Sequence, residues 1–207
     1  ALNPSISGNN RNMAKNGEDM NDAPAQANNM PADTQLVTLQ LGGNNLCKSS
    51  VDAMTTVAQY RASFVQTLDI IRNRMPNALI QIQSVPDIYN LWFLRGAPNP
   101  PNDQPSSRAG TARTFWGLGL IPCESLVANA TSMTQADIDR RNAVRQRNIE
   151  YNAVLAEECE KRLRCRFDRY ATFNFSSNRA QPPYGAYLPR AQWQFVDDDI
   201  STIDHFH

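Results

Sequence analysis

Hydrophobic and polar side chains alternate over a short stretch in the first quarter of the chain. The apolar positions are Val37, Leu39 and Leu41, and the polar ones between them are Thr38 and Gln40. This period of two predicts a β-strand from Leu36 to Leu41 with one buried face. Gly42-Gly43 follows at once, and glycine lets the backbone turn sharply and come close to a ligand.

Two asparagines, Asn44 and Asn45, follow these glycines at the carboxyl end of the predicted strand. In open α/β sheets, ligands bind at this end of the strands. An ordinary strand with a Gly-rich turn would show the same local pattern, so the functional interpretation depends on other parts of the chain.

A long apolar stripe predicts a helix from Ala53 to Met75. Its residues recur at spacings of three, four or seven and are Met54, Val57, Phe64, Leu68, Ile71 and Met75. Such a stripe forms one face of a helix, and we interpret it as core rather than as a cofactor site. Pro76 ends the helix, because the residue before a proline disfavours the helical conformation.

A second long helix is predicted from Thr134 to about Leu163. Thr134 is a candidate N-cap, with Asp137 in the place of the usual Glu of a capping box. The apolar face consists of Ile138, Val144, Tyr151, Leu155 and Leu163. The arginine cluster of this helix, interpreted as its solvated face, consists of Arg140, Arg141, Arg145 and Arg147.

Shorter patterns predict a helix from Asp22 to Met30 and strands over Ala78–Val85 and Cys165–Asp168. Residues 12–17 favour a further short strand that closes in a turn, after a loop over residues 1–12. The alternation of strands and helices predicts an α/β fold in which helices cover both faces of a mainly parallel sheet.

Residues 95–113 are rich in Pro, Gly, Asn and Ser and predict a long loop. Long loops in compact domains often form lids or mobile segments. The residues expected to pack this loop down are Phe115, Trp116, Leu118, Leu120 and Ile121.

Length and charge exclude several classes of protein. The chain has 207 residues, which indicates a single domain, and 41% of them are hydrophobic, enough to form a core. Lys and Arg number 20, as do Asp and Glu, so the chain lacks the basic surface typical of nucleic-acid binding. No apolar run reaches the roughly 18 residues that a membrane span needs, and Ala1-Leu2-Asn3-Pro4 does not resemble a signal peptide.

The four cysteines, Cys47, Cys123, Cys159 and Cys165, fit two disulfides and allow three pairings. No CxxC pair occurs and both histidines stand at the end of the sequence, which argues against a metal site. Glycosylation triplets begin at Asn129 and Asn174. Together with the cysteines, these triplets favour a secreted or extracellular protein.

The last residues offer candidate catalytic chemistry. Asp204 stands three residues before His207, so its carboxylate can accept a hydrogen bond from the imidazole and fix the tautomer. His207 can then act as general base toward a serine hydroxyl. An Asp and a His at this spacing also occur often by chance.

Three motifs in this order are more specific: Asn12-x-Ala14-x-x-Gly17, Gly42-Gly43-Asn44-Asn45 and Asp204-x-x-His207. Together they resemble the SGNH (GDSL) hydrolase family, in particular its secreted lipases and phospholipase B-like esterases. Residues 36–47, 84–89 and 200–207 carry the similarity, which therefore spans nearly the whole chain. The resemblance implies a three-layer α/β/α sandwich of the flavodoxin-like type and hydrolysis of an ester or lipid substrate, without a cofactor.

The resemblance also implies roles for individual residues. The backbone N–H of Gly17 and the side-chain amide of Asn44 would donate to the oxyanion. His207 would be the base and Asp204 its orienting partner. The implied disulfides are Cys47–Cys123 and Cys159–Cys165, of which the second would join the end of a helix to the following strand.

The chain departs from the family at two places beside the proposed oxyanion hole. Asn45 stands where the family usually has Asp, which keeps the shape of the side chain but removes its charge, and so puts the support of the neighbouring loop in question. Glu18 follows Gly17 where the family favours a small residue. A carboxylate at that position is expected to crowd or recharge the oxyanion hole.

The family's Gly-Asp-Ser nucleophile motif is absent, and neither Ser5 nor Ser7 follows a predicted strand. The family also continues beyond the catalytic histidine, whereas this sequence ends at His207. We therefore expect residues 1–207 to be a single SGNH-like domain, incomplete at both ends, whose first strand and serine come from another segment or chain. The alternatives are an SGNH fold that has lost catalysis and become a structural or binding protein, and a generic α/β domain with chance motif matches.

Overall fold

Three short parallel strands form the sheet of this protein, seen in a computed structural model that describes residues 9–98 and 123–177. The strands are β1 (Leu36–Leu39), β2 (Leu79–Ile82) and β3 (Cys165–Phe167), and they lie in the order β1-β2-β3. Val37 is paired with Ile80, and Ile80 with Cys165. The predicted parallel α/β architecture is confirmed at this level.

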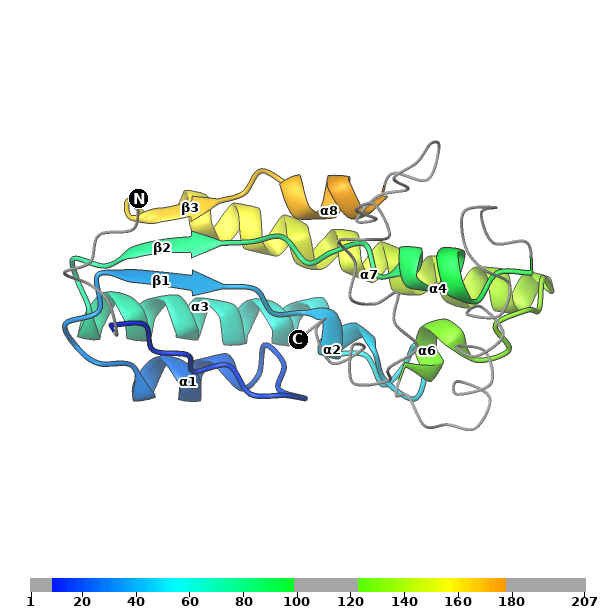
Figure 1. The fold of residues 1–207 in the computed structure, drawn as a ribbon, viewed down its shortest axis with the longest axis horizontal. Helices are drawn as coiled ribbons and strands as arrows, with labels where there is room; N and C mark the ends of the chain where they lie inside the picture. Colours follow the sequence, from blue (N-terminus) through cyan, green and yellow to red (C-terminus); the bar gives the residue numbers. More distant parts are fainter. Residues whose placement is uncertain (1–8, 99–122, 178–207) are drawn as a thin grey trace.

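Within the described residues, two long helices run beside the sheet and five shorter ones accompany them (Figure 1). The helices are α1 (Ala23–Asn29), α2 (Gly43–Leu46), α3 (Val57–Arg74), α4 (Tyr89–Arg95), α6 (Glu124–Val127), α7 (Gln135–Glu160) and α8 (Ala171–Ser177). α3 packs against both α1 and α7, and α7 packs against β3. The carboxyl ends of the strands point toward the end of the molecule where α2, α4, α6 and α8 lie (Figure 1).

Polar caps fix where the two long helices begin. Thr56 and Gln59 form a reciprocal capping box, in which each side chain accepts a hydrogen bond from the other's backbone N–H. α3 therefore starts at Val57 rather than at the predicted Ala53, because a capping residue lies outside the helical conformation. The predicted N-cap of α7 is confirmed, since the hydroxyl of Thr134 accepts from the N–H of Asp137.

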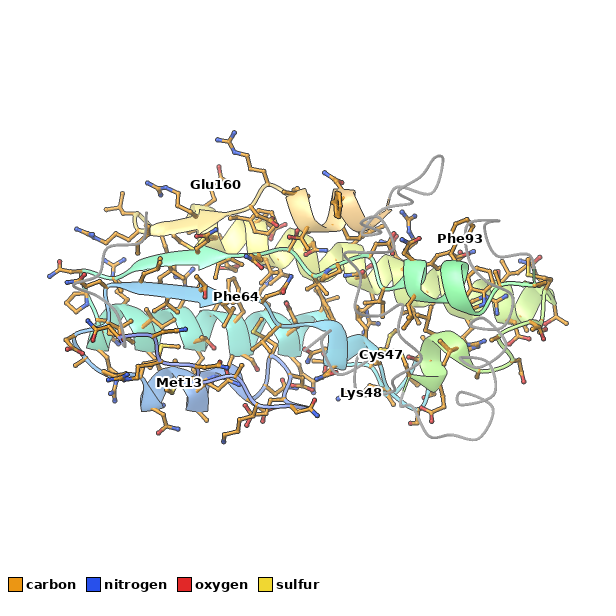
Figure 2. All side chains as sticks on the ribbon, in the orientation of Figure 1. Met13, Cys47, Lys48, Phe64, Phe93 and Glu160 are labelled. Atoms are coloured by element: carbon orange, nitrogen blue, oxygen red, sulfur yellow. A yellow bond between two sulfur atoms is a disulfide. The ribbon has the colours of Figure 1, made fainter. Side chains whose placement is uncertain are left out.

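The core lies on one face of the sheet. Val37, Leu39, Ile80 and Ile82 are buried in a cluster with residues of α3 and α7, and Phe64, the α3 residue labelled in Figure 2, is fully buried there. The opposite face carries the strand positions between them, where Leu36 is 53% and Leu79 is 40% exposed. The described residues thus account for one helical layer of the predicted sandwich.

Two local predictions are wrong. Residues 12–17 form an irregular segment and a turn instead of a strand. Leu163, assigned to the apolar face of the second long helix, is 89% exposed, because α7 ends at Glu160 and Leu163 lies in the turn before β3.

The interpretation of the four arginines of α7 as a solvated face is also wrong. Arg141 is fully buried, and its guanidinium lies 4.2 Å from the centre of the Trp92 ring. Arg140, Arg145 and Arg147 each donate to a carbonyl or carboxylate of a neighbouring segment. Arginine stems pack on apolar surface while their heads satisfy buried acceptors, so helical periodicity alone did not reveal their role.

Several predictions fall on parts of the chain outside residues 9–98 and 123–177. They include residues 1–8 of the loop predicted over residues 1–12, and residues 99–113 of the loop predicted over residues 95–113. They also include Phe115, Trp116, Leu118, Leu120, Ile121, Asp204 and His207. Residue 95, where the second loop was predicted to begin, is the last residue of α4.

Candidate functional site

The chain turns at Gly42 to pass from β1 into α2, and this position requires glycine. Its φ is +144°, and a Cβ atom placed there would lie 2.5 Å from Cγ2 of Val85. Both the backbone conformation and the space exclude a side chain at this position. Glycine therefore allows the end of β1 and the segment after β2, which carries Val85, to approach closely. The asparagines of α2 therefore begin immediately beyond the carboxyl end of β1.

Asn45 is fully buried and joins three segments of the chain. Its Oδ1 accepts a hydrogen bond from the N–H of Met20 at 2.9 Å, and its Nδ2 donates to Oγ1 of Thr55 at 3.0 Å. A neutral amide thus supports the neighbouring loop at this position.

The side-chain amide of Asn44 donates to the backbone carbonyl of Glu18 at 2.8 Å. Glu18 follows Gly17, which adopts a φ of +81° in the turn over residues 16–17. Of the four residues predicted to act in catalysis, Gly17 and Asn44 are among the described residues, and Asn44 contacts the residue that follows Gly17. The other two, Asp204 and His207, lie outside the described residues.

The carboxylate of Glu18 has its partners on α1 and in the preceding turn. It accepts from the side-chain amide of Gln26 and forms an ion pair with Lys15 at 3.4 Å. A small hollow of about 150 Å³ lies beside these groups, between residues 12–18 and α1. These contacts tie the carboxylate to α1, while the backbone carbonyl of the same residue meets Asn44.

An ion pair joins the loop before α1 to the segment after α2. Nζ of Lys48 lies 3.0 Å from Oδ2 of Asp19, whose side chain is mostly buried. The other carboxylate oxygen of Asp19 accepts from the N–H of Asn21 at 2.8 Å. The loop that carries Gly17 is therefore held to α2 by both hydrogen bonds and charge.

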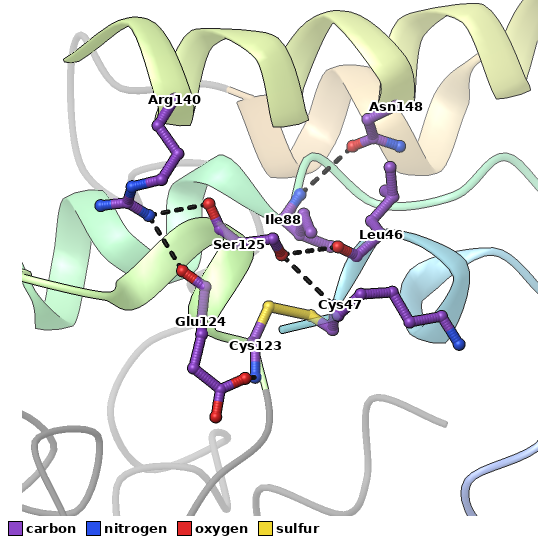
Figure 3. Close-up of a disulfide and its surroundings, with 9 residues drawn as sticks. Leu46, Cys47, Ile88, Cys123, Glu124, Ser125, Arg140 and Asn148 are labelled. Carbon is purple, nitrogen blue, oxygen red and sulfur yellow. Dashed lines mark hydrogen bonds between the residues drawn. A yellow bond between two sulfur atoms is a disulfide. The ribbon is translucent and has the colours of Figure 1, made fainter. Parts of the chain in front are cut away.

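The disulfide between Cys47 and Cys123 fixes the end of α2 to α6 (Figure 3). Beside it, the hydroxyl of Ser125 donates to the carbonyl of Leu46 at 2.7 Å and accepts from the N–H of Lys48. Arg140 donates to the carbonyls of Glu124 and Ser125, so α7 holds α6 from the other side (Figure 3).

The second disulfide joins Cys159 of α7 to Cys165 of β3. Both pairings implied by the family resemblance are thus confirmed. In Figure 2, Cys47 lies beyond the carboxyl ends of the strands, whereas Glu160, the neighbour of Cys159 in sequence, lies beside the sheet.

Two stacked tyrosines support α2 from the helical layer. The rings of Tyr60 and Tyr151 are parallel, with centres 4.0 Å apart. Tyr60 donates to the carbonyl of Leu41 at 2.7 Å, and Tyr151 donates to that of Thr55. Burial raises the pKa of Tyr151 to about 12 and also raises that of Tyr60, so both hydroxyls stay protonated donors at neutral pH.

Two asparagines of α7 hold the segment that follows β2. The side chain of Asn152 accepts from the N–H of Val85 at 2.7 Å and donates to its carbonyl at 3.0 Å. Asn148, one turn earlier, accepts from the N–H of Ile88 (Figure 3). Sequence reasoning missed both residues, although two asparagines four apart on a helix share a face and so offered a signal.

Ser84, at the end of β2, is fully buried and bonded to Asp168 at the end of β3. Its hydroxyl donates to this carboxylate at 2.8 Å and accepts from the N–H of Phe173 in α8. Burial raises the pKa of Asp168, but hydrogen bonds from Ser84 and Thr172 outweigh this effect and hold the pKa below its ordinary value. This serine anchors α8 and has the contacts of a structural residue.

The two glycosylation candidates lie in different settings. Asn129 is exposed in the turn after α6, and Asn174 is exposed within α8. Across residues 9–98 and 123–177, no group of His, Cys, Asp and Glu side chains could hold a metal ion. None of the helices in these two ranges is long and apolar enough to cross a membrane.

Comparisons with known proteins do not assign the chain to a family. No protein-family model matches it. A search of curated proteins finds no match either.

Proposed function

We propose that this chain is part of a secreted serine ester hydrolase of the SGNH type, acting on an ester or lipid substrate. The observation that supports it best is the contact between Asn44 and the loop of Gly17. The amide of Asn44 contacts the carbonyl of the residue after Gly17, near the carboxyl end of β1, and ligands bind at this end of the strands in sheets of this kind. The two disulfides suit an oxidising, extracellular setting.

In the proposed mechanism, a serine outside this chain attacks the ester carbonyl and His207 accepts its proton, oriented by Asp204. The negative charge that develops on the carbonyl oxygen is stabilised by Gly17 and Asn44. The buried anchors around Asn45 keep these donors fixed, which matters because preorganised donors need no rearrangement during the reaction. A strand that precedes the serine would pair with β1, which is an edge strand of the sheet among residues 9–98 and 123–177.

A second candidate is an SGNH-type fold that binds or supports a partner without catalysis. It is favoured by the same hydrogen bond, because an amide that donates to the carbonyl of Glu18 already has a structural role. The two proposals differ in whether Asn44 contributes to turnover beyond its effect on stability.

The test uses the intact protein that contains this chain. We expect a fluorophosphonate probe to label one serine, and Asn44→Ala to lower kcat for a short-chain nitrophenyl ester by about 10²–10³-fold. The matched control is Asn73→Ala, an exposed asparagine of α3, which should leave kcat unchanged.

Unfolding of both variants is followed in parallel, so that a loss of turnover can be separated from a loss of structure. Absence of labelling in the folded protein would exclude the hydrolase and favour the binding protein. Normal turnover in Asn44→Ala would remove Asn44 from the oxyanion hole.

A further inference from the structure

The turn after α6 begins with the triplet Asn129-Ala130-Thr131. Asn129 has a φ of +48°, a left-handed conformation that asparagine tolerates better than most residues. Both Asn129 and Thr131 are exposed. Among the described contacts, the side chains of these two residues make no hydrogen bond to the protein.

The backbone carbonyls of this turn, in contrast, accept hydrogen bonds at four of its residues, 128, 129, 130 and 132. The carbonyl of Ala128 accepts from Arg140, and that of Asn129 accepts from the N–H of Ser132. The carbonyl of Ala130 accepts from Trp92, and that of Ser132 accepts from Arg141. The bonds from Trp92 and Arg141 are each 2.7 Å long. The turn is therefore rigid, while the amide of Asn129 and the hydroxyl of Thr131 remain on its outer side.

The second triplet, Asn174-Phe175-Ser176, lies within α8. The N–H of Asn174 is bonded to the carbonyl of Tyr170 in the helical manner. Asn174 therefore belongs to a hydrogen-bonded helix, whereas Asn129 lies in a turn.

We propose that Asn129 carries an N-linked glycan and that it is modified in preference to Asn174. In this step, Nδ2 of Asn129 attacks the anomeric carbon of an oligosaccharide linked to a lipid through diphosphate. The C–N bond forms as the bond to the diphosphate oxygen breaks, the lipid diphosphate leaves with the electron pair, and one amide proton passes to a base of the transferase. The acceptor motif and its exposed position are those that this modification requires.

The experiment directs the intact protein to the endoplasmic reticulum of a eukaryotic cell by an added leader. Glycans are removed enzymatically in heavy-oxygen water, which marks each formerly occupied asparagine as a labelled aspartate in its peptide. Occupancy is measured on the retained and exported pools together, so the result does not depend on export. We expect most Asn129 to be labelled and Asn174 to be labelled at least several-fold less.

Three variants separate the glycan from the fold. Asn129→Gly keeps the positive φ, Thr131→Ala keeps Asn129, and both should lose the mass of one glycan while retaining both disulfides. Thr131→Ser keeps the hydroxyl and should remain modified. The proposal is overturned if Asn129 is unmodified, if Asn174 is occupied to an equal or greater extent, or if Thr131→Ala stays glycosylated at Asn129.

Discussion

The side-chain oxygen of Asn45 accepts a hydrogen bond from the backbone N–H of Met20 at 2.9 Å, although the two residues are 25 positions apart. Both residues are fully buried. The amide of Asn45 therefore adds a buried connection between the loop that carries Gly17 and the helix that carries Asn44.

Replacement of Asn45 by alanine should destabilise the intact protein. The N–H of Met20 and the hydroxyl of Thr55 would lose a partner in a buried site, at a cost of about 2–3 kcal/mol in the free energy of unfolding. Urea unfolding measures this difference, with Asn73→Ala as a surface control expected within about 0.5 kcal/mol of the parent. A loss below about 1 kcal/mol would mean that water or a rearranged loop satisfies these groups.

Alanine at two glycines should have different effects, although both have positive φ. At Gly42 the new Cβ would lie 2.5 Å from Val85, whereas at Gly17 no atom lies within 4 Å. Gly17→Ala should therefore cost only the backbone strain, about 1–2 kcal/mol, and Gly42→Ala clearly more. Thermal unfolding of the two variants side by side gives the comparison. Equal losses of stability in the two variants would show that the segment around Val85 can move away from the new Cβ at little cost in free energy.

The two disulfides should contribute unequally to stability. Cys47–Cys123 joins residues 76 positions apart, and Cys159–Cys165 residues 6 apart. In the chain-entropy model, a loop of the first size stabilises by about 4.5 kcal/mol and one of the second size by about 2 kcal/mol. Paired alanine variants of each bridge, compared by denaturant unfolding, test this order. The opposite order would indicate that native contacts rather than loop closure dominate.

The carboxylate of Glu158 should make stability depend on pH in the acid range. Its hydrogen bond from Lys161 lowers its pKa, burial opposes this effect, and a hydrogen bond from Arg61 lowers the pKa further. Because the folded pKa is lower than the unfolded one, the stabilisation is present above about pH 4.3, the ordinary glutamate value. It is lost as the pH falls through the folded pKa.

The difference in unfolding free energy between the parent protein and Glu158→Gln should therefore shrink as the pH is lowered from 6 to about 3. Glu160→Gln serves as the control, since Glu160 is exposed on the same turn. A difference that stays constant over this range would show that the Glu158 carboxylate has the same pKa in both states.

The alternation of residues in β1 and the stripe of α3 predicted a strand and a helix, because periods of two and of three to four residues follow directly from strand and helix geometry. The order of strands and helices along the chain then predicted a parallel α/β fold. The N-cap at Thr134 was equally local. The predicted disulfide pairing came from family resemblance instead, since four cysteines alone allow three pairings.

What only the tertiary structure decided is which polar side chains turn inward. Arg147, Asn45 and Asn152 each satisfy backbone groups of segments far away in sequence, and no local pattern specifies such partners. The strand, the glycine turn and Asn44 could be located from sequence, because each depends on neighbouring residues. The contact that brings Asn44 to the loop of Gly17 could not, because it depends on how β1, α1 and α2 pack around a buried amide.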